Sequence, residues 1–145
     1  MRTKANLANI CPVFLSPDVR KTVQFYVEKL GFKYATHLDK IDSFATIYRD
    51  TIEIVVVQLT KGAVTPNSEL YGKGYDTYIN PKTVRDVDLL HEEFQKQNIQ
   101  ILKKPHLTDY GSREFSFKDC DGRIIGVGRI ADKEKFFTES NFLDE

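Results

Sequence analysis

The feature that most constrains the fold of this chain is a repeat, because one order of predicted elements occurs twice along the sequence. In the first half, the order strand, helix, strand, strand, strand falls on residues 9–15, 19–30, 32–37, 43–48 and 51–59. In the second half, the same order falls on residues 75–80, 83–97, 99–102, 114–118 and 124–127. An offset of 67 residues places Val23 on Leu90 and Phe32 on Ile99. We therefore predict an internal duplication.

Each predicted helix has one apolar face and recognisable ends. The apolar residues recur at spacings of three and four, which places them on one side of a helix. They are Val19, Val23, Tyr26 and Leu30 in the first helix, and Val84, Val87, Leu90 and Phe94 in the second. Ser16 or Asp18 can cap the start of the first helix, and Thr83 helps to open the second. Gly31 and Asn98 stand where the helices end, a position that favours a left-handed backbone.

The second half closes with a predicted β-hairpin. Phe115 and Phe117 alternate with polar residues, which is the period of two expected of a half-buried strand. Residues 119–122, Asp-Cys-Asp-Gly, supply the turn, because aspartate side chains accept hydrogen bonds from nearby backbone N–H groups and Gly122 can adopt a positive φ. A hairpin is not stable alone in water, so this one requires further strands and a cover for its apolar face.

The chain length suits a single domain built from two small modules. We expect the first module at about residues 7–60, a linker at 61–74, the second module at about 75–130 and a tail at 131–145. The linker is predicted from its glycine, proline, asparagine and serine residues and from its lack of periodicity. The tail is charged and carries Phe136, Phe137 and Phe142, which we expect to dock on the same subunit or on a partner.

Charge and cysteine content narrow the classes of function. Lysine plus arginine equals aspartate plus glutamate at 21 each, and a formal net charge of zero argues against nucleic-acid binding. Cys11 and Cys120 lie far apart, without CxxC spacing, and are predicted to be reduced thiols. No apolar run resembles a signal peptide or approaches the roughly 20 residues of a membrane span. We therefore expect a cytoplasmic protein without nucleic-acid or membrane partners.

Four motifs carry a family resemblance. They are Asp-Val-Arg-Lys-Thr-Val-Gln-Phe-Tyr at 18–26, Leu-Gly-Phe at 30–32, Gly-Ser-Arg-Glu-Phe at 111–115 and the turn at 119–122. Together with the tandem modules they resemble the vicinal-oxygen-chelate superfamily of glyoxalase I, extradiol dioxygenases and fosfomycin-resistance proteins, and most closely its bleomycin-resistance branch. The resemblance implies an α+β fold of two βαβββ modules, whose eight strands curl into an incomplete barrel around a cleft with the helices outside. It also implies a homodimer in which both chains contribute to each cleft.

Metal-dependent members of that superfamily hold one divalent ion with side chains from the first and fourth strands of each module. The matching positions here are Cys11, Glu53, a position near Asp76, and Gly126. Gly126 has no side chain to offer, and a cysteine thiolate suits a softer metal than the family's His, Gln and Glu donors hold. None of the three histidines stands at an expected ligand position, and His91 is expected at the surface or its boundary. We therefore predict no metal and no other cofactor.

Strand alternation predicts which side chains share a face with those positions. They are Cys11, Val13, Leu15, Thr51, Glu53, Val55, Val57, Asp76, Tyr78, Asn80, Ile124, Gly126 and Gly128. This face is mostly apolar and its glycines remove bulk, so it suits a small, partly aromatic ligand held by packing. Glu53 or Asp76 could accept hydrogen bonds from an amine of that ligand, or each could be structural and paired with a nearby Arg or Lys. Arg113 is the candidate partner across the sheet.

From these arguments we take eight residues as candidates for ligand binding. They are Cys11, Val13, Glu53, Val55, Asp76, Tyr78, Arg113 and Gly126. The favoured function is binding of a small organic molecule, an antibiotic or a metabolite, in the cleft without metal chemistry or turnover. One alternative is a metal-dependent lyase, isomerase or dioxygenase, and another is an interaction or regulatory module with a vestigial cleft. No Ser–His–Asp or Cys–His pairing is visible to support nucleophilic catalysis.

Overall fold

The computed structural model describes residues 3–35 and 43–131, and the chain divides between Gly62 and Ala63 into two compact units. Each unit contains one βαβββ module, so the predicted duplication and the α+β fold class are confirmed. The predicted strand end at 36–37, the connection at 38–42 and the three aromatic residues of the tail lie outside the described residues.

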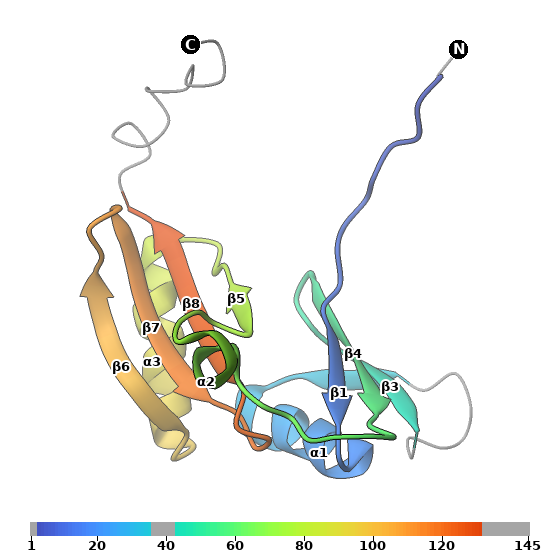
Figure 1. Cartoon of the computed structure of the whole chain (residues 1–145). Helices are drawn as coiled ribbons and strands as arrows, with labels where there is room; N and C mark the ends of the chain where they lie inside the picture. The colour runs from blue at the N-terminus through green and yellow to red at the C-terminus, as the bar shows by residue number, and fades with distance from the viewer. Residues whose placement is uncertain (1–2, 36–42, 132–145) are drawn as a thin grey trace. The chain divides into compact units, whose positions relative to one another are not determined.

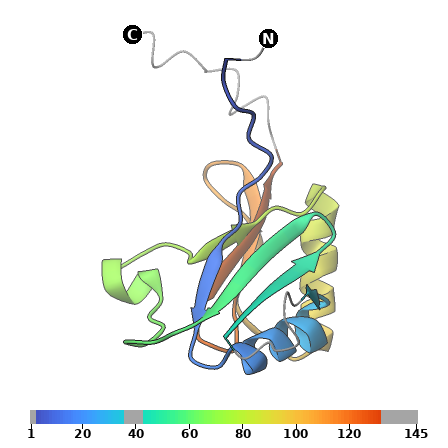
Figure 2. The same cartoon turned by 90° about the vertical axis from the view of Figure 1, so that its right-hand side faces the viewer.

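The first unit is a four-stranded sheet with one helix packed on it (Figures 1 and 2). Its elements are β1 (Val13–Ser16), α1 (Val19–Leu30), β2 (Lys33–Ala35), β3 (Phe44–Arg49) and β4 (Ile52–Gln58). The strand order is β1-β4-β3-β2, with β1 parallel to β4 and the other neighbours antiparallel. The first strand begins at Val13 and not at residue 9, since Pro12 has no N–H to donate, although its carbonyl still accepts from the Val55 N–H at 2.9 Å.

The ends and the buried face of α1 are as predicted. The Asp18 carboxylate accepts a hydrogen bond from the Lys21 backbone N–H at 3.2 Å, and Gly31 takes a left-handed φ of 75°. The Tyr26 ring lies 6.2 Å from that of Phe14 and 5.4 Å from that of Phe32. The core of this unit is completed by Val19, Val23, Leu30, Ala45, Ile47, Ile54 and Val56, all buried. Each large side chain in it stabilises the fold by about 1.5–3 kcal/mol.

The second unit repeats this topology (Figure 1). Its elements are α2 (Asn67–Tyr71), β5 (Thr77–Ile79), α3 (Val84–Lys96), β6 (Gln100–Leu107), β7 (Ser112–Lys118) and β8 (Ile124–Ile130). The strand order β5-β8-β7-β6 matches that of the first unit, with β5 parallel to β8. The short helix α2 falls inside the predicted linker, where five residues are too few to show a helical period. β6 runs past the predicted end at residue 102 because two irregularities in its pairing with β7 let it continue.

One prediction about α3 is wrong. Its buried residues are Val87, His91 and Phe94, whereas Leu90 is half-buried. His91 is 8% exposed, and its ring meets that of Phe115 edge-on at 5.3 Å. The end of the helix does match the prediction, because Asn98 has a left-handed φ of 58°.

Alternation along β7 separates two faces of the second sheet. Phe115 and Phe117 point to the α3 side, where their rings lie 6.2 and 5.0 Å from that of Phe94. Ser112, Glu114 and Ser116 therefore point to the opposite face. Within the described residues, no helix is both long enough and apolar enough to cross a bilayer.

Candidate functional site

In the first unit, the sheet face opposite α1 carries apolar side chains that the unit leaves in contact with solvent. Phe14, Ile54 and Val56 point to the helix side and are buried. Their neighbours in the strands point the other way, and Val13 is 60% and Leu15 48% exposed. The parallel register sets Val13 beside Val55 and Leu15 beside Val57. This register builds one continuous apolar strip across β1 and β4.

One carboxylate stands at the end of this strip. Glu53 is exposed on β4, two residues before Val55, and faces the same side as the strip. Its cross-strand neighbour is Tyr48, which is 38% exposed and was not among the predicted residues. Cys11 lies just before β1 and is half-buried, and neither Cys11 nor Cys120 forms a disulfide among the described residues. The unit thus presents an apolar surface with a charged and aromatic end.

In the second unit, the space that the glycines were expected to leave open is filled. A Cβ on Gly126 would lie 2.5 Å from Cδ2 of the Tyr75 ring. A Cβ on Gly128 would overlap the Tyr78 hydroxyl. The rings of Tyr75 and Tyr78 stack with centroids 5.8 Å apart. The glycines therefore make room for two tyrosines of the same unit, which corrects the expectation of an open space above β8.

The tyrosines surround a buried carboxylate, that of Glu114, which is 2% exposed. The Tyr75 hydroxyl donates to Oε1 at 3.0 Å and the Tyr78 hydroxyl to Oε2 at 2.7 Å. The Tyr110 hydroxyl lies 2.8 Å from both oxygens. The Tyr78 oxygen also lies 3.0 Å from Oγ of Ser112, which can donate to it in turn. We call Glu114, Tyr75, Tyr78 and Tyr110 the tyrosine–glutamate cluster.

The phenols of this cluster are held in their neutral form. Burial first, and then the negative charge of Glu114, raise the pKa of Tyr75 to about 12. Burial is also the main cause of the raised pKa values of Tyr78 and Tyr110, to which their hydrogen bonds with Glu114 add. A phenol that keeps its proton remains a hydrogen-bond donor. Among the described residues, the side chains that donate to this carboxylate are therefore all neutral phenols.

Two other candidates of the second unit have structural partners. The Asp76 carboxylate accepts the backbone N–H groups of Asn67 and Ile124, each at 2.8 Å, and so ties the start of α2 to the start of β8. Arg113 points to the helix side of the sheet, where Nε and NH2 each donate to the Asp88 carboxylate at 2.8 Å. The expected pairing of Arg113 with Glu53 or Asp76 is thus corrected, because strand alternation turns Arg113 toward α3.

The second-unit positions that match metal ligands of the superfamily that the sequence resembles do not suit a metal. Gly126 has no donor atom, and the ring of Tyr75 occupies the place of a side chain. Both oxygens of Asp76 already accept backbone N–H groups. A divalent transition ion needs three or four protein donors, and these two positions offer no uncommitted one.

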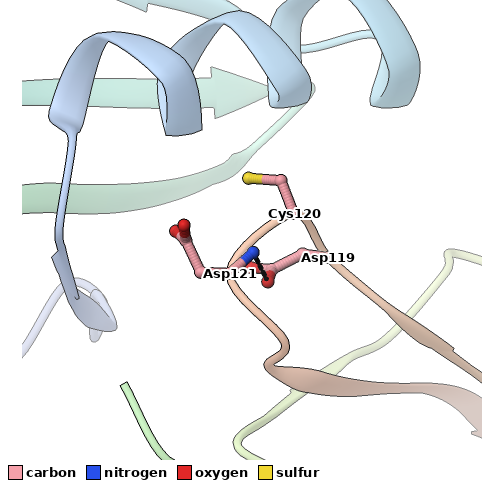
Figure 3. A group of neighbouring side chains, drawn as sticks. All are labelled: Asp119, Cys120 and Asp121. Atoms are coloured by element: carbon pink, nitrogen blue, oxygen red, sulfur yellow. Dashed lines mark hydrogen bonds between the residues drawn. The ribbon is translucent and has the colours of Figure 1, made fainter. Parts of the chain in front are cut away.

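A second acidic group lies in the β7–β8 turn, where ligand atoms of Asp119, Cys120 and Asp121 fall within 4.8 Å of one another (Figure 3). Arg123 already pairs with both carboxylates, since NH1 donates to Asp119 at 2.8 Å and to Asp121 at 2.9 Å. Asp119 also accepts the backbone N–H groups of Asp121 and Arg123, as the predicted turn requires. Gly122 has the expected positive φ of 87°. The group is a structural turn.

Sequence reasoning missed Glu114, Tyr75 and Tyr110. Glu114 was assigned to the polar face of a strand. Its side chain does point to that face, but it is buried there and not exposed to solvent. One signal in the sequence was not used, namely the two glycines at positions 126 and 128, which the structure pairs with Ser116 and Glu114. Glycines opposite a polar strand face indicate that something bulky covers it.

Comparisons with known proteins agree on the fold. The family model of the Glyoxalase/Bleomycin resistance protein/Dioxygenase superfamily matches residues 12–127. A glyoxalase/bleomycin resistance protein/dioxygenase from Alicyclobacillus acidocaldarius has 16% identity and a TM-score of 0.67, over 88% of this chain and 95% of that one. The bleomycin-binding protein of Streptomyces verticillus, solved with copper(II)-bleomycin, has 20% identity and a TM-score of 0.63, over 86% and 97%.

A third structure, lactoylglutathione lyase from Agrobacterium tumefaciens, has 15% identity and a TM-score of 0.64, over 86% of this chain and 95% of that one. A comparison with curated proteins finds no match. One of these similar structures is that of a binding protein and another that of a lyase, so the shared fold does not by itself select a chemistry.

Proposed function

Since the chain belongs to the glyoxalase/bleomycin resistance protein/dioxygenase superfamily, we propose that it binds a small organic molecule, an antibiotic or a metabolite, without metal chemistry. The ligand has an apolar body and an amine or other cationic group. The observation that carries the proposal is the face of the first sheet opposite α1, where Val13 and Leu15 are 60% and 48% exposed. Binding of an apolar ligand to this face would remove these side chains from water, which is favourable.

The charged end of the strip gives the ligand its orientation. Glu53 accepts hydrogen bonds from the amine, and Tyr48 beside it offers an aromatic face to the same cation. Val55 and Cys11 line the apolar part. We also propose, from the superfamily resemblance, that the protein acts as a cytoplasmic homodimer. Its mass at micromolar concentration checks this, and a monomer would contradict it.

The test is a ligand panel with matched pairs. Alkyl and aryl amines are compared with neutral isosteres of the same shape by calorimetry and by thermal stabilisation, which follows ligand concentration relative to Kd. We expect saturable binding without product formation, and a preference for the amine of about tenfold. Glu53→Gln should remove that preference and leave the binding of neutral isosteres unchanged.

The control is Glu92→Gln, which changes an exposed carboxylate on α3 of the second unit. This variant should bind like the original protein. A panel that leaves the melting temperature unchanged would overturn the proposal. Turnover that requires an added metal would overturn it in favour of a metal-dependent enzyme.

A further inference from the structure

We propose that the tyrosine–glutamate cluster of the second unit is a further binding site, whose ligand is a planar cation with two parallel N–H donors, an amidinium or a guanidinium. The cation takes the place of the Tyr110 hydroxyl on the Glu114 carboxylate. The site goes beyond the function proposed above, because all its residues belong to the second unit and none to the strip around Glu53.

The positions of the three phenols define the shape of the ligand. Tyr75 and Tyr78 each bond one oxygen of Glu114, at 3.0 and 2.7 Å. Tyr110 alone is equidistant from both oxygens, at 2.8 Å, which puts its hydroxyl close to the bisector of the carboxylate. A fork of two N–H groups approaches a carboxylate along the same bisector and bonds both oxygens.

The charge of the cluster favours a cation in that place. Within the described part of the chain, Glu114 has no cationic partner: the adjacent Arg113 pairs with Asp88 on the other face of the sheet. His106 on β6 is the cross-strand neighbour of Glu114, and its Nδ1 lies 2.8 Å from the carbonyl oxygen of Lys104. A buried carboxylate whose donors are all neutral gains a Coulombic attraction when a cation replaces one of them, and a planar fork can then bond both oxygens.

Tyr110 is the most exposed residue of the cluster. This residue stands in the connection between β6 and β7 and is 48% exposed, whereas Tyr78 is 40% exposed and Glu114 2%. Displacement of Tyr110 therefore uncovers the carboxylate and leaves Tyr75 and Tyr78 in place. The stacked rings of Tyr75 and Tyr78 belong to the same cluster, and a guanidinium or amidinium plane packs well on aromatic faces.

The experiment compares benzamidine with benzylamine and neutral benzamide by calorimetry on the full chain. Benzamidine should bind at least about tenfold more tightly than benzamide, and more tightly than benzylamine, which has no fork. Tyr110→Phe should strengthen benzamidine binding several-fold, because it removes the competing hydroxyl and leaves Glu114 in place. Glu114→Gln should abolish the preference for benzamidine over benzamide.

Two controls separate this site from others. Tyr71→Phe alters a tyrosine of α2 that is 76% exposed and should change nothing. Glu53→Gln should leave the preference for benzamidine over benzylamine intact, because that preference depends on the fork and not on charge alone. The proposal is overturned if benzamidine binds no better than benzamide, or if Tyr110→Phe leaves its affinity unchanged or weakens it. If Glu114→Gln does not fold, the Tyr110→Phe result decides alone.

Discussion

The ring of Tyr75 lies over the backbone of Gly126, so close that a Cβ on the glycine would come within 2.5 Å of Cδ2. The same phenol reaches Glu114 Oε1 at 3.0 Å. A residue just before β5 therefore fills the gap left by a glycine in β8 and covers a charge in β7. The space that a side chain at position 126 would need is thus occupied by the ring of Tyr75.

Gly126→Ala should destabilise the protein by about 1–3 kcal/mol, because the new methyl group forces the Tyr75 ring away from its place. The measurement is urea denaturation. In the Tyr75→Ala background the same substitution should cost much less, because the space is then free. Equal costs in the two backgrounds would contradict the packing described here.

Arg123→Ala should cost about 3–5 kcal/mol in urea denaturation, since it leaves a buried carboxylate without its cation. The side chains of Arg123 and Asp119 are 5% and 0% exposed. The matched control is Arg85→Ala on the exposed surface of α3, which should stay within about 0.5 kcal/mol of the original protein. Similar losses in both variants would show that the turn does not depend on the pair.

His91 should make the fold sensitive to mild acid. Burial lowers the pKa of His91, against the opposing effect of Asp88, and Nε2 has no hydrogen-bond partner within the described residues. The unfolded chain then binds a proton more readily than the folded chain, so stability falls as pH drops through about 6.5, the ordinary histidine value. His91→Leu should flatten this slope between pH 7.5 and 5.5. An unchanged slope would contradict the assignment.

The pair of Asp88 and Arg113 should add stability in a lower pH range. The hydrogen bonds from Arg113 lower the pKa of Asp88 in the folded chain. The pair therefore contributes to the free energy of unfolding above about pH 3.9, and this contribution is lost as the pH falls below that value. The side chains are 41% and 34% exposed, so solvent screening limits the pair to about 0.5–1 kcal/mol. A double-mutant cycle with Asp88→Ala and Arg113→Ala measures it. A coupling that persists unchanged in 1 M salt would argue against an electrostatic origin.

Local signals predicted the elements well. Asp18 caps α1, Gly31 ends it, Asn98 ends α3 and Gly122 turns the last hairpin, all as the sequence indicated. Each of these depends on neighbours within a few residues, so the residue type alone carries the information. The order of the elements, which defines the two modules, follows from the same local patterns.

The buried face of α3 could not be predicted from the local sequence alone. Val87 and Phe94 are compatible with either Leu90 or His91 on the buried face, since both lie within one turn of them. Hydrophobicity favoured Leu90, but the packing of α3 on Phe115 buries His91. The position of the helix on its sheet decides between the two.

The sequence by itself determined two βαβββ modules, their caps and turns, and which side chains of β4 share a face with Glu53, because these depend on short-range periodicity. The apolar strip is continuous only because β1 pairs with β4, which the tertiary structure decided. Only the tertiary structure decided that Arg113 binds Asp88, that tyrosines occupy the space above Gly126 and Gly128, and that Glu114 is buried among them. Tyr75 and Tyr78 precede Glu114 by 39 and 36 residues. No local pattern records which distant side chain will fill a gap, since that depends on the register of β5 against β8 and of β8 against β7.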